Sequence, residues 1–178
     1  LNEEKWTRAT INNYTINNFE EFNTLLKEFK KDNTYTSIKE ITDEYLKHNK
    51  NSIVALYISS MIGLENNESL DENNNIYTLI KIFTDNLKWN IVEYLSKKVL
   101  DHIEDKYVLK TLIQTYNNLN KKDQLPELWE RLIKVDYEEA DAVVNLANHK
   151  EEKGELEEAI AYFKKAINRY IMSKNFSQ

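Results

Sequence analysis

Apolar residues recur at helical spacing along almost the whole chain. Between 17 and 31, the apolar residues recur at spacing i, i+3, i+6, i+7 and i+10, which places them on one face of a helix: Phe19, Phe22, Leu25, Leu26 and Phe29. Similar stripes continue to residue 171, and most are separated by only a few polar residues. The pattern therefore predicts about nine helices, and the short loops predict antiparallel neighbours. The helices are expected at about 17–31, 37–48, 52–64, 75–85, 89–103 and 107–119, with three more between 125 and 171.

Three segments differ from the common pattern. The helix expected at 52–64 is apolar on nearly all sides, which is typical of a helix buried between neighbours. The stretch 65–75 is the longest polar run, and we expect it to be a surface loop. It is also the one possible seam in what we otherwise expect to be a single helical-repeat domain over 1–178. Residues 1–15 are expected to form a short helix or a strap.

The segment 125–171 holds the best-formed helical hairpin. Gly154 follows a helix with Lys in its last turn, which is typical of a left-handed position just past a helix end. The next helix places Ala159, Phe163 and Ala166 on one face, so that small residues allow close approach while the ring fills the gap. Leu146 and its apolar neighbours form the matching face of the preceding helix.

This order of residues resembles the tetratricopeptide (TPR) repeat, whose period is about 34 residues. A step of 34 residues back from Leu146, Gly154, Ala159, Phe163 and Ala166 reaches Leu112, Asn120, Leu125, Trp129 and Leu132. Asn is the residue after Gly that best tolerates a left-handed turn. A second step reaches Thr78, Asn86, Ile91, Leu95 and Lys98, where the match has weakened. The best-formed repeats are therefore 106–139 and 140–173, in an all-α, TPR-like right-handed superhelix of stacked antiparallel hairpins.

Composition narrows the class of protein. With two Gly and one Pro in 178 residues, sheets with tight turns are disfavoured. The chain has no Cys, which excludes disulfides and thiolate metal sites and agrees with the cytoplasm. No apolar run approaches the roughly 18 residues that would indicate a membrane span. The net charge of −6 opposes a broad phosphate-binding surface, so we expect no direct contact with nucleic acid.

The sequence shows no catalytic constellation, and we expect neither a cofactor nor a metal. His48, His102 and His149 are far apart in sequence and match no ligand spacing. Neighbouring Glu residues on a helix do not converge on one point, so pairs such as Glu157 and Glu158 are expected to be solvated surface charges. The sequence therefore favours the hypothesis of an interaction protein over that of an enzyme.

The candidate binding residues lie on the first helix of each repeat, which lines the concave face in a TPR-like stack. They are polar residues outside the predicted core: Lys110, Gln114 and Asn117 in one repeat, and Asn145 and Asn148 in the next. Their side chains suit contact with a peptide backbone or a terminal carboxylate. The alternative is an ordinary solvated helix surface, and the few positive charges do not make a full carboxylate site.

One further resemblance extends beyond a generic repeat. The segment 128–171, with LWERLIKVDYEEAD, then K-x-E-x-G-x-x-E-x-A-x-x-Y-F-K-K-A over 150–166 and then NRYI, resembles the long N-terminal helical extension of some large Gre-type (GreA/GreB) bacterial transcription elongation factors. The resemblance implies a cytoplasmic protein that acts on RNA polymerase. In that family an acidic coiled-coil tip promotes transcript cleavage, and no residue here matches that tip. The resemblance therefore implies that the cleavage-promoting part lies beyond Gln178, and that this chain is a fragment.

The leading hypothesis is that the chain is the non-catalytic protein-interaction domain of such a factor, with RNA polymerase as a possible partner. The alternative is a TPR-like adaptor that holds a peptide or protein unrelated to transcription. An enzyme built on a helical solenoid is a third and weaker alternative. The oligomeric state is not indicated by the sequence.

Overall fold

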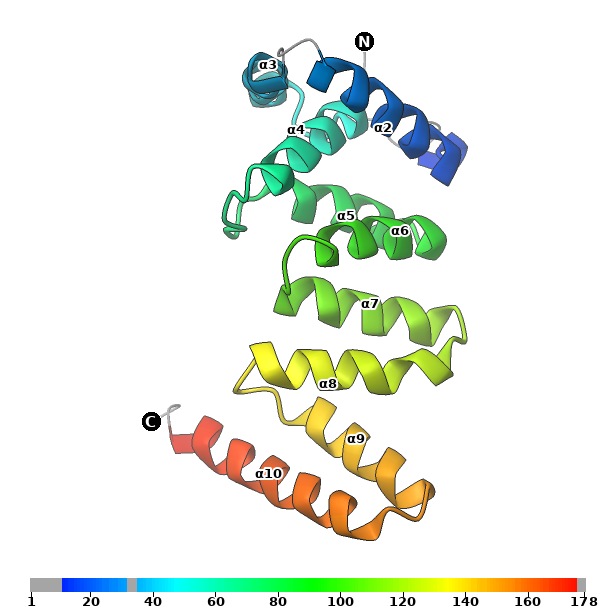
Figure 1. Ribbon diagram of the computed structural model, residues 1–178, viewed down its shortest axis with the longest axis vertical. Coiled ribbons are helices and arrows are strands. Elements are labelled where there is room, and N and C mark those ends of the chain that lie inside the picture. Colours follow the sequence, from blue (N-terminus) through cyan, green and yellow to red (C-terminus); the bar gives the residue numbers. More distant parts are fainter. Residues whose placement is uncertain (1–10, 32–34, 176–178) are drawn as a thin grey trace. The chain divides into compact units, whose positions relative to one another are not determined.

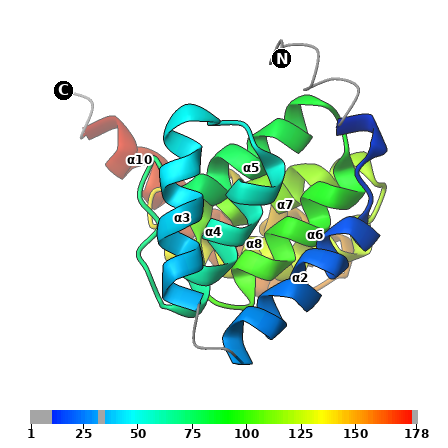
Figure 2. The same cartoon turned by 90° about the horizontal axis from the view of Figure 1, so that it is seen from above.

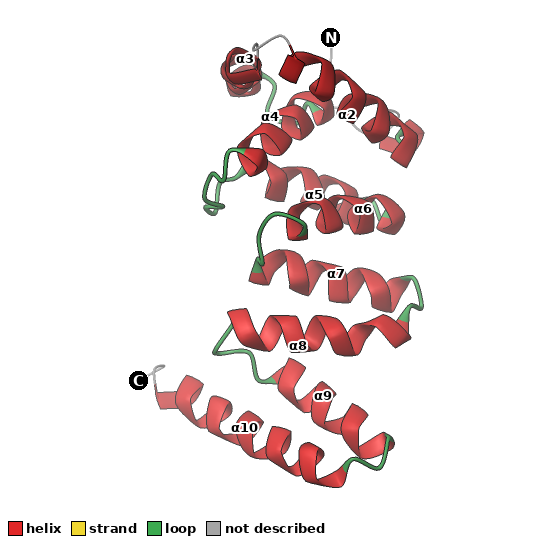
Figure 3. Ribbon diagram, viewed as in Figure 1, coloured by secondary structure: helices red, strands yellow, loops and turns green. Residues whose placement is uncertain are grey.

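The computed structural model describes residues 11–31 and 35–175, apart from the side chain of Asn175, and in these residues it is helical with no strand (Figures 1 and 3). Within this part, nine helices have eleven residues or more, as the apolar stripes predict. The all-α, TPR-like helical-repeat class is confirmed. The helices are α2 (Ile16–Lys31), α3 (Tyr35–His48), α4 (Ile53–Glu65), α5 (Asn75–Asp85), α6 (Trp89–Leu100), α7 (Lys106–Asn118), α8 (Leu125–Val135), α9 (Asp141–Glu152) and α10 (Leu156–Asn175), with a short 3-10 helix at Lys122–Gln124.

The chain divides into two compact units, Leu1–Ile103 and Glu104–Gln178. The polar stretch 65–75, which the sequence offered as a possible seam, lies inside the first unit and connects two helices that pack together, α4 and α5. The expected strap over residues 1–15 falls mostly outside the described residues, of which Ile11–Asn13 are helical.

In the first unit, α4 is buried on almost every side, as its uniform apolar character predicts. The helix α2 lies alongside α4 and α6 (Figure 2). Its Phe19 is fully buried, with ring centroids 5.0 Å from Tyr57 of α4 and 5.7 Å from Phe83 of α5. Aromatic pairs at these distances add to the burial free energy. Phe19 thus fixes α2 on the unit, whereas Leu25 of the same predicted stripe is exposed.

A hydrogen-bonded chain runs along one edge of this aromatic cluster. The Tyr57 hydroxyl donates to the Asn23 Oδ1 at 2.6 Å, the Asn23 amide donates to the Tyr94 oxygen at 2.9 Å, and Tyr94 donates to Glu20 at 2.5 Å. Burial, and after it the hydrogen bond to Glu20, raises the pKa of Tyr94 to about 12. The chain satisfies the polar atoms that α2 brings to α4 and α6.

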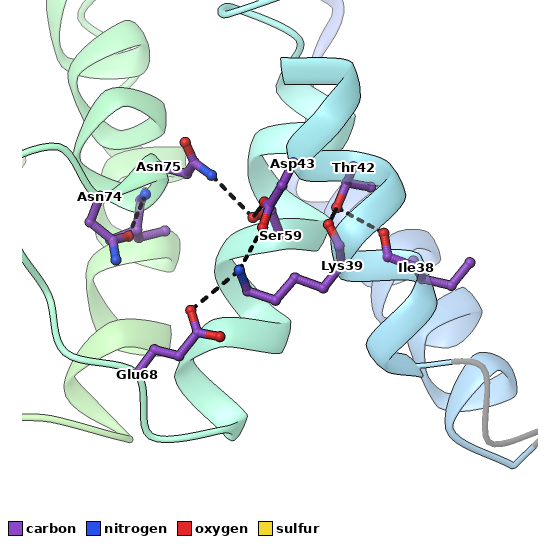
Figure 4. Close-up of polar contacts among 9 residues, drawn as sticks. Ile38, Lys39, Thr42, Asp43, Ser59, Glu68, Asn74 and Asn75 are labelled. Carbon is purple, nitrogen blue, oxygen red and sulfur yellow. Dashed lines mark hydrogen bonds and ion pairs between the residues drawn. The ribbon is translucent and has the colours of Figure 1, made fainter. Parts of the chain in front are cut away.

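A second polar network in the first unit joins α3, α4 and α5 (Figure 4). The buried Ser59 hydroxyl donates to Asp43 of α3 and accepts a 3.0 Å hydrogen bond from the Asn75 side chain at the start of α5. Lys39 pairs with Asp43 at 2.7 Å and with Glu68 at 3.3 Å. Because Glu68 belongs to the polar stretch 65–75, this network anchors that loop to α3.

In the second unit, consecutive helices from α7 to α10 pack against one another as antiparallel layers (Figure 1). Ala159 and Ala166 are each 2% exposed against α9, as the small-residue positions predict. The prediction that Phe163 fills the interior is only partly right, because its ring is half-buried. Leu146 is fully buried on α9, as predicted.

The turns between paired helices share one geometry. Gly154 has φ +79° and Asn120 has φ +57°, so both predicted left-handed positions are confirmed. The residue after each turn donates back five positions at 2.9 Å, Glu155 to Lys150 and Lys121 to Tyr116. This is the Schellman arrangement, in which backbone N–H groups beyond the helix satisfy its last free carbonyls.

The structure corrects the second 34-residue step, which relates the α7–α8 hairpin to the α5–α6 hairpin. Leu87, and not Asn86, takes the left-handed position with φ +57°, and Lys88 donates to the Phe83 carbonyl at 2.9 Å in the same arrangement. This turn precedes that at Asn120 by 33 residues and not 34. With this shift, the positions of the α7–α8 hairpin map onto fully buried residues of α5 and α6: Leu79, Phe83, Val92, Ser96 and Val99.

Candidate protein-binding face

The predicted binding residues on α7 lie on the side of the helix away from its buried residues. Lys110, Gln114 and Asn117 are all exposed, whereas Leu109 and Leu112 are buried. The Asn117 amide donates to the Ile113 carbonyl of its own helix at 3.1 Å. The three side chains therefore form one outward row, as their spacing predicts.

The predicted residues on α9 have the same kind of position. Asn145 and Asn148 are exposed, and Leu146 and Ala147 beside them are buried. Both α7 and α9 pack against α8. The structure thus places the five residues in two outward rows on two helices of one unit.

Lys110 differs from the four amide residues because it is paired with charged side chains outside its own helix. Its ammonium lies 2.9 Å from Asp136 and 3.1 Å from Glu139, both in the loop between α8 and α9. Burial opposes the charge of Lys110, but the hydrogen bonds to the two carboxylates outweigh it and raise its pKa. Two negative partners neutralise the ammonium, so Lys110 is poorly suited to bind a peptide carboxylate.

The α8–α9 loop, residues 136–140, is also held from the opposite side by a residue that the sequence did not single out. Arg169 of α10 is 7% exposed, and its guanidinium donates to the carbonyls of Asp136 at 3.0 Å, Glu139 at 2.7 Å and Ile133 at 2.8 Å. A buried guanidinium is stable only when its donors are paired, and here backbone oxygens pair them.

The two acidic residues of the loop have structural tasks of their own. The Glu139 carboxylate accepts from the Ala142 amide at 3.0 Å at the start of α9, where a negative charge favours the helix dipole. Burial of Asp136 opposes its ionisation, but the bond to Lys110 outweighs this effect and lowers its pKa. The loop therefore joins α7, α8, α9 and α10 in a fixed geometry. This geometry sets the positions of the two amide rows, which are Gln114 and Asn117 on α7 and Asn145 and Asn148 on α9.

The sequence gives little indication of the contacts that hold the α8–α9 loop. Arg169 lies one turn beyond Ala166 on α10, and the sequence did not mark it because a buried Arg is rare unless paired. Its partners are main-chain carbonyls about thirty residues away, and carbonyls carry no side-chain identity. Asp136 and Glu139 belong to an acidic segment that resembles ordinary surface charge.

The described residues contain no group of three His, Cys, Asp or Glu side chains that could hold a metal ion. The His149 ring packs edge-on to Trp129 at 6.5 Å, and the Nδ1 of His102 lies 3.0 Å from the Lys98 carbonyl of its own helix. No helix in the described part of the chain combines the length and the apolar character needed to cross a membrane.

No family model matches the chain, but two curated proteins are similar to it in sequence. It is 40% identical over 158 residues to a GreA-associated domains protein of Treponema pallidum (strain Nichols), in an alignment that covers 89% of this chain and 24% of that protein. It is 34% identical over 177 residues to the transcription elongation factor GreA of Borreliella burgdorferi (strain ATCC 35210 / DSM 4680 / CIP 102532 / B31), which covers 99% of this chain and 19% of that protein.

Among solved structures, the crystal structure of MamA has a TM-score of 0.50 at 16% identity, and the match covers 84% of this chain and 96% of that one. At this identity the likeness concerns the fold alone. The chain spans about a quarter or less of the length of the curated relatives that it matches. The chain is therefore a TPR-like helical domain homologous to a segment of Gre-type proteins, in agreement with the resemblance seen in its sequence.

Proposed function

We propose that this chain is a non-catalytic protein-interaction domain of a Gre-type elongation factor, and that it acts with bacterial RNA polymerase in the cytoplasm. The observation that carries this proposal is the 34% identity, over almost the whole chain, to a protein named transcription elongation factor GreA. A stack of helical hairpins offers long outward helix rows, and such rows suit protein recognition more than bond-making chemistry.

The proposed contact surface is the pair of amide rows on α7 and α9. Gln114, Asn117, Asn145 and Asn148 each carry a side-chain amide, which can donate and accept at the same time. This pairing capacity matches the N–H and C=O groups of a peptide backbone. Because Asp136 and Glu139 neutralise Lys110, the surface favours an uncharged stretch of a protein partner over a terminal carboxylate.

The domain is proposed to work without touching nucleic acid or membrane. The net charge of −6 repels phosphate groups, and affinity for a nucleic-acid backbone depends on Lys and Arg in excess. On this proposal, contact with the transcript belongs to another part of the polypeptide or to the polymerase itself.

The test is a direct binding measurement with immobilised bacterial core RNA polymerase. Wild-type chain should bind, and a variant carrying Gln114→Ala, Asn117→Ala and Asn148→Ala should lose affinity by tenfold or more. Alanine is a strong helix former, so these exposed substitutions should preserve the fold. A matched control carries Asn90→Ala and Asn168→Ala, which remove exposed helix amides on α6 and α10.

Two results would contradict the proposal in different ways. If the wild-type chain does not bind polymerase but captures another purified protein through the same amides, the chain is an adaptor unrelated to transcription. If the triple variant binds polymerase as tightly as the control, the partner uses another surface of the domain.

A further inference from the structure

The helix α10 carries a row of large apolar side chains that face outward. Leu156, Ile160, Ile167 and Ile171 are each more than half exposed, at 59%, 53%, 56% and 54%. Together with the half-buried Phe163 they recur at helical spacing, so they form one continuous stripe that we call the α10 stripe. A stripe of five large apolar residues is more than the scattered exposed residues that a stable surface normally shows.

The internal repeat shows what covers two positions of this stripe, 163 and 167, one hairpin earlier. In the 34-residue register, Ile133 of α8 corresponds to Ile167 of α10, and Trp129 corresponds to Phe163. Ile133 is 5% exposed, whereas Ile167 is 56% exposed. The Trp129 ring packs against His149 of α9, and α8 as a whole packs on α9. The first helix of the next hairpin therefore covers this side of α8.

We propose that the α10 stripe is the docking site for the first helix of a further hairpin of the same polypeptide, packed on α10 as α9 packs on α8. The stripe extends from residue 156 to 171, which at 1.5 Å per residue is about 22 Å and accommodates a helix of the length of α9. The occupant is expected to repeat the inward pattern of α9, with small and branched apolar residues as at Ala142, Val143, Leu146 and Ala147.

The length of the relatives supports an occupant from the same polypeptide. The match to this chain fills 24% of one curated relative and 19% of the other, so both proteins carry long additional sequence that could supply such a helix. A second copy of this chain fits the stripe less well. Lys164 lies beside the middle of the stripe, and antiparallel pairing of two α10 helices about their midpoints would bring the two Lys164 ammonium groups together.

The experiment compares the 178-residue chain with the natural polypeptide that carries the residues following it. Hydrogen exchange of backbone amides in α10 should be at least tenfold slower in the longer protein, because a docked helix suppresses local opening. Ile167→Asp should abolish this difference and leave the exchange of α10 in the 178-residue chain almost unchanged. Asn168→Asp, which adds the same charge at an exposed site beside the stripe, should preserve the difference.

Equal exchange of α10 in the two proteins would overturn the proposal. It would also be overturned if the 178-residue chain formed a concentration-dependent dimer in sedimentation that Ile167→Asp abolished, because the occupant would then be a second copy. Both variants change exposed residues, so a loss of fold is not expected to obscure the comparison. The result does not depend on whether polymerase is the partner of α7 and α9.

Discussion

At the scale of single residues, the chain uses three different side chains for one backbone conformation. Leu87, Asn120 and Gly154 have φ values of +57°, +57° and +79°. The conformation is easy for Gly and tolerable for Asn, but a Leu side chain crowds the following carbonyl. Leu87 is also 68% exposed, so it gains little from burial in return.

Leu87→Gly is therefore expected to raise the free energy of unfolding by about 1 kcal/mol, because it removes the strain of a left-handed residue without losing core contacts. Urea denaturation would measure the change. The mirror substitution Gly154→Leu should lower the same quantity by a similar amount, since the space around Gly154 is open and only the backbone conformation resists a side chain. An unchanged or lower stability of Leu87→Gly would show that this turn is not strained.

At the scale of helices and loops, the α8–α9 loop is the point where the second unit depends on specific polar contacts. Its carbonyls bind Arg169 and its carboxylates bind Lys110. Breaking one side of such a network leaves buried polar groups without partners, which costs more than the intact bonds contribute.

Arg169→Met keeps a long side chain but removes the donors to three carbonyls. We expect it to lower the free energy of unfolding by about 3 kcal/mol. The matched control is Lys165→Met on the exposed side of the same helix, which should change stability by less than about 0.5 kcal/mol. Chemical denaturation would measure the free energy of unfolding of both variants. Equal losses would show that Arg169 does not hold the α8–α9 loop.

The loop also predicts a dependence of stability on pH. The pKa of Asp136 is lowered in the folded state, so ionised Asp136 stabilises the fold above the unfolded pKa of about 3.9, and this contribution is lost as pH falls through the lower folded pKa. Asp136→Asn should therefore be less stable than wild type at neutral pH and should lose less stability on acidification. Thermal melts of both proteins at several pH values between neutral and acidic would measure this difference. If Asp136 had no such role, the melting temperatures of the two proteins would change with pH in parallel.

At the scale of the whole molecule, the sequence predicted what depends on local pattern. Helix number and faces follow from apolar spacing, and the turns at Asn120 and Gly154 follow from residues that favour a left-handed conformation. The register of the earlier hairpin was missed because Leu87 carries no such signal and Asn86 beside it does. The contacts of Arg169 could not be read, because its partners are main-chain oxygens distant in sequence.

The candidate binding face was predicted only in part. The outward position of the four amides follows from helical spacing, and the structure agrees with it. The engagement of Lys110 was not predictable, since it depends on how the α8–α9 loop turns back toward α7.

The bonds from Arg169 to the α8–α9 loop have a consequence for synthesis on the ribosome. The guanidinium joins the Asp136 carbonyl across 33 residues, which at 5–20 residues per second is a delay of about 2 to 7 s after the loop has been made. During that interval the nascent loop lacks its hydrogen bonds to Arg169 and keeps only contacts to residues already made, among them Lys110 and the Ala142 amide. Chains that end before Arg169 and are held on a stalled ribosome by a linker long enough to expose residues 136–140 should accordingly be cleaved there by added protease, and chains stalled well after α10 has emerged should resist cleavage there.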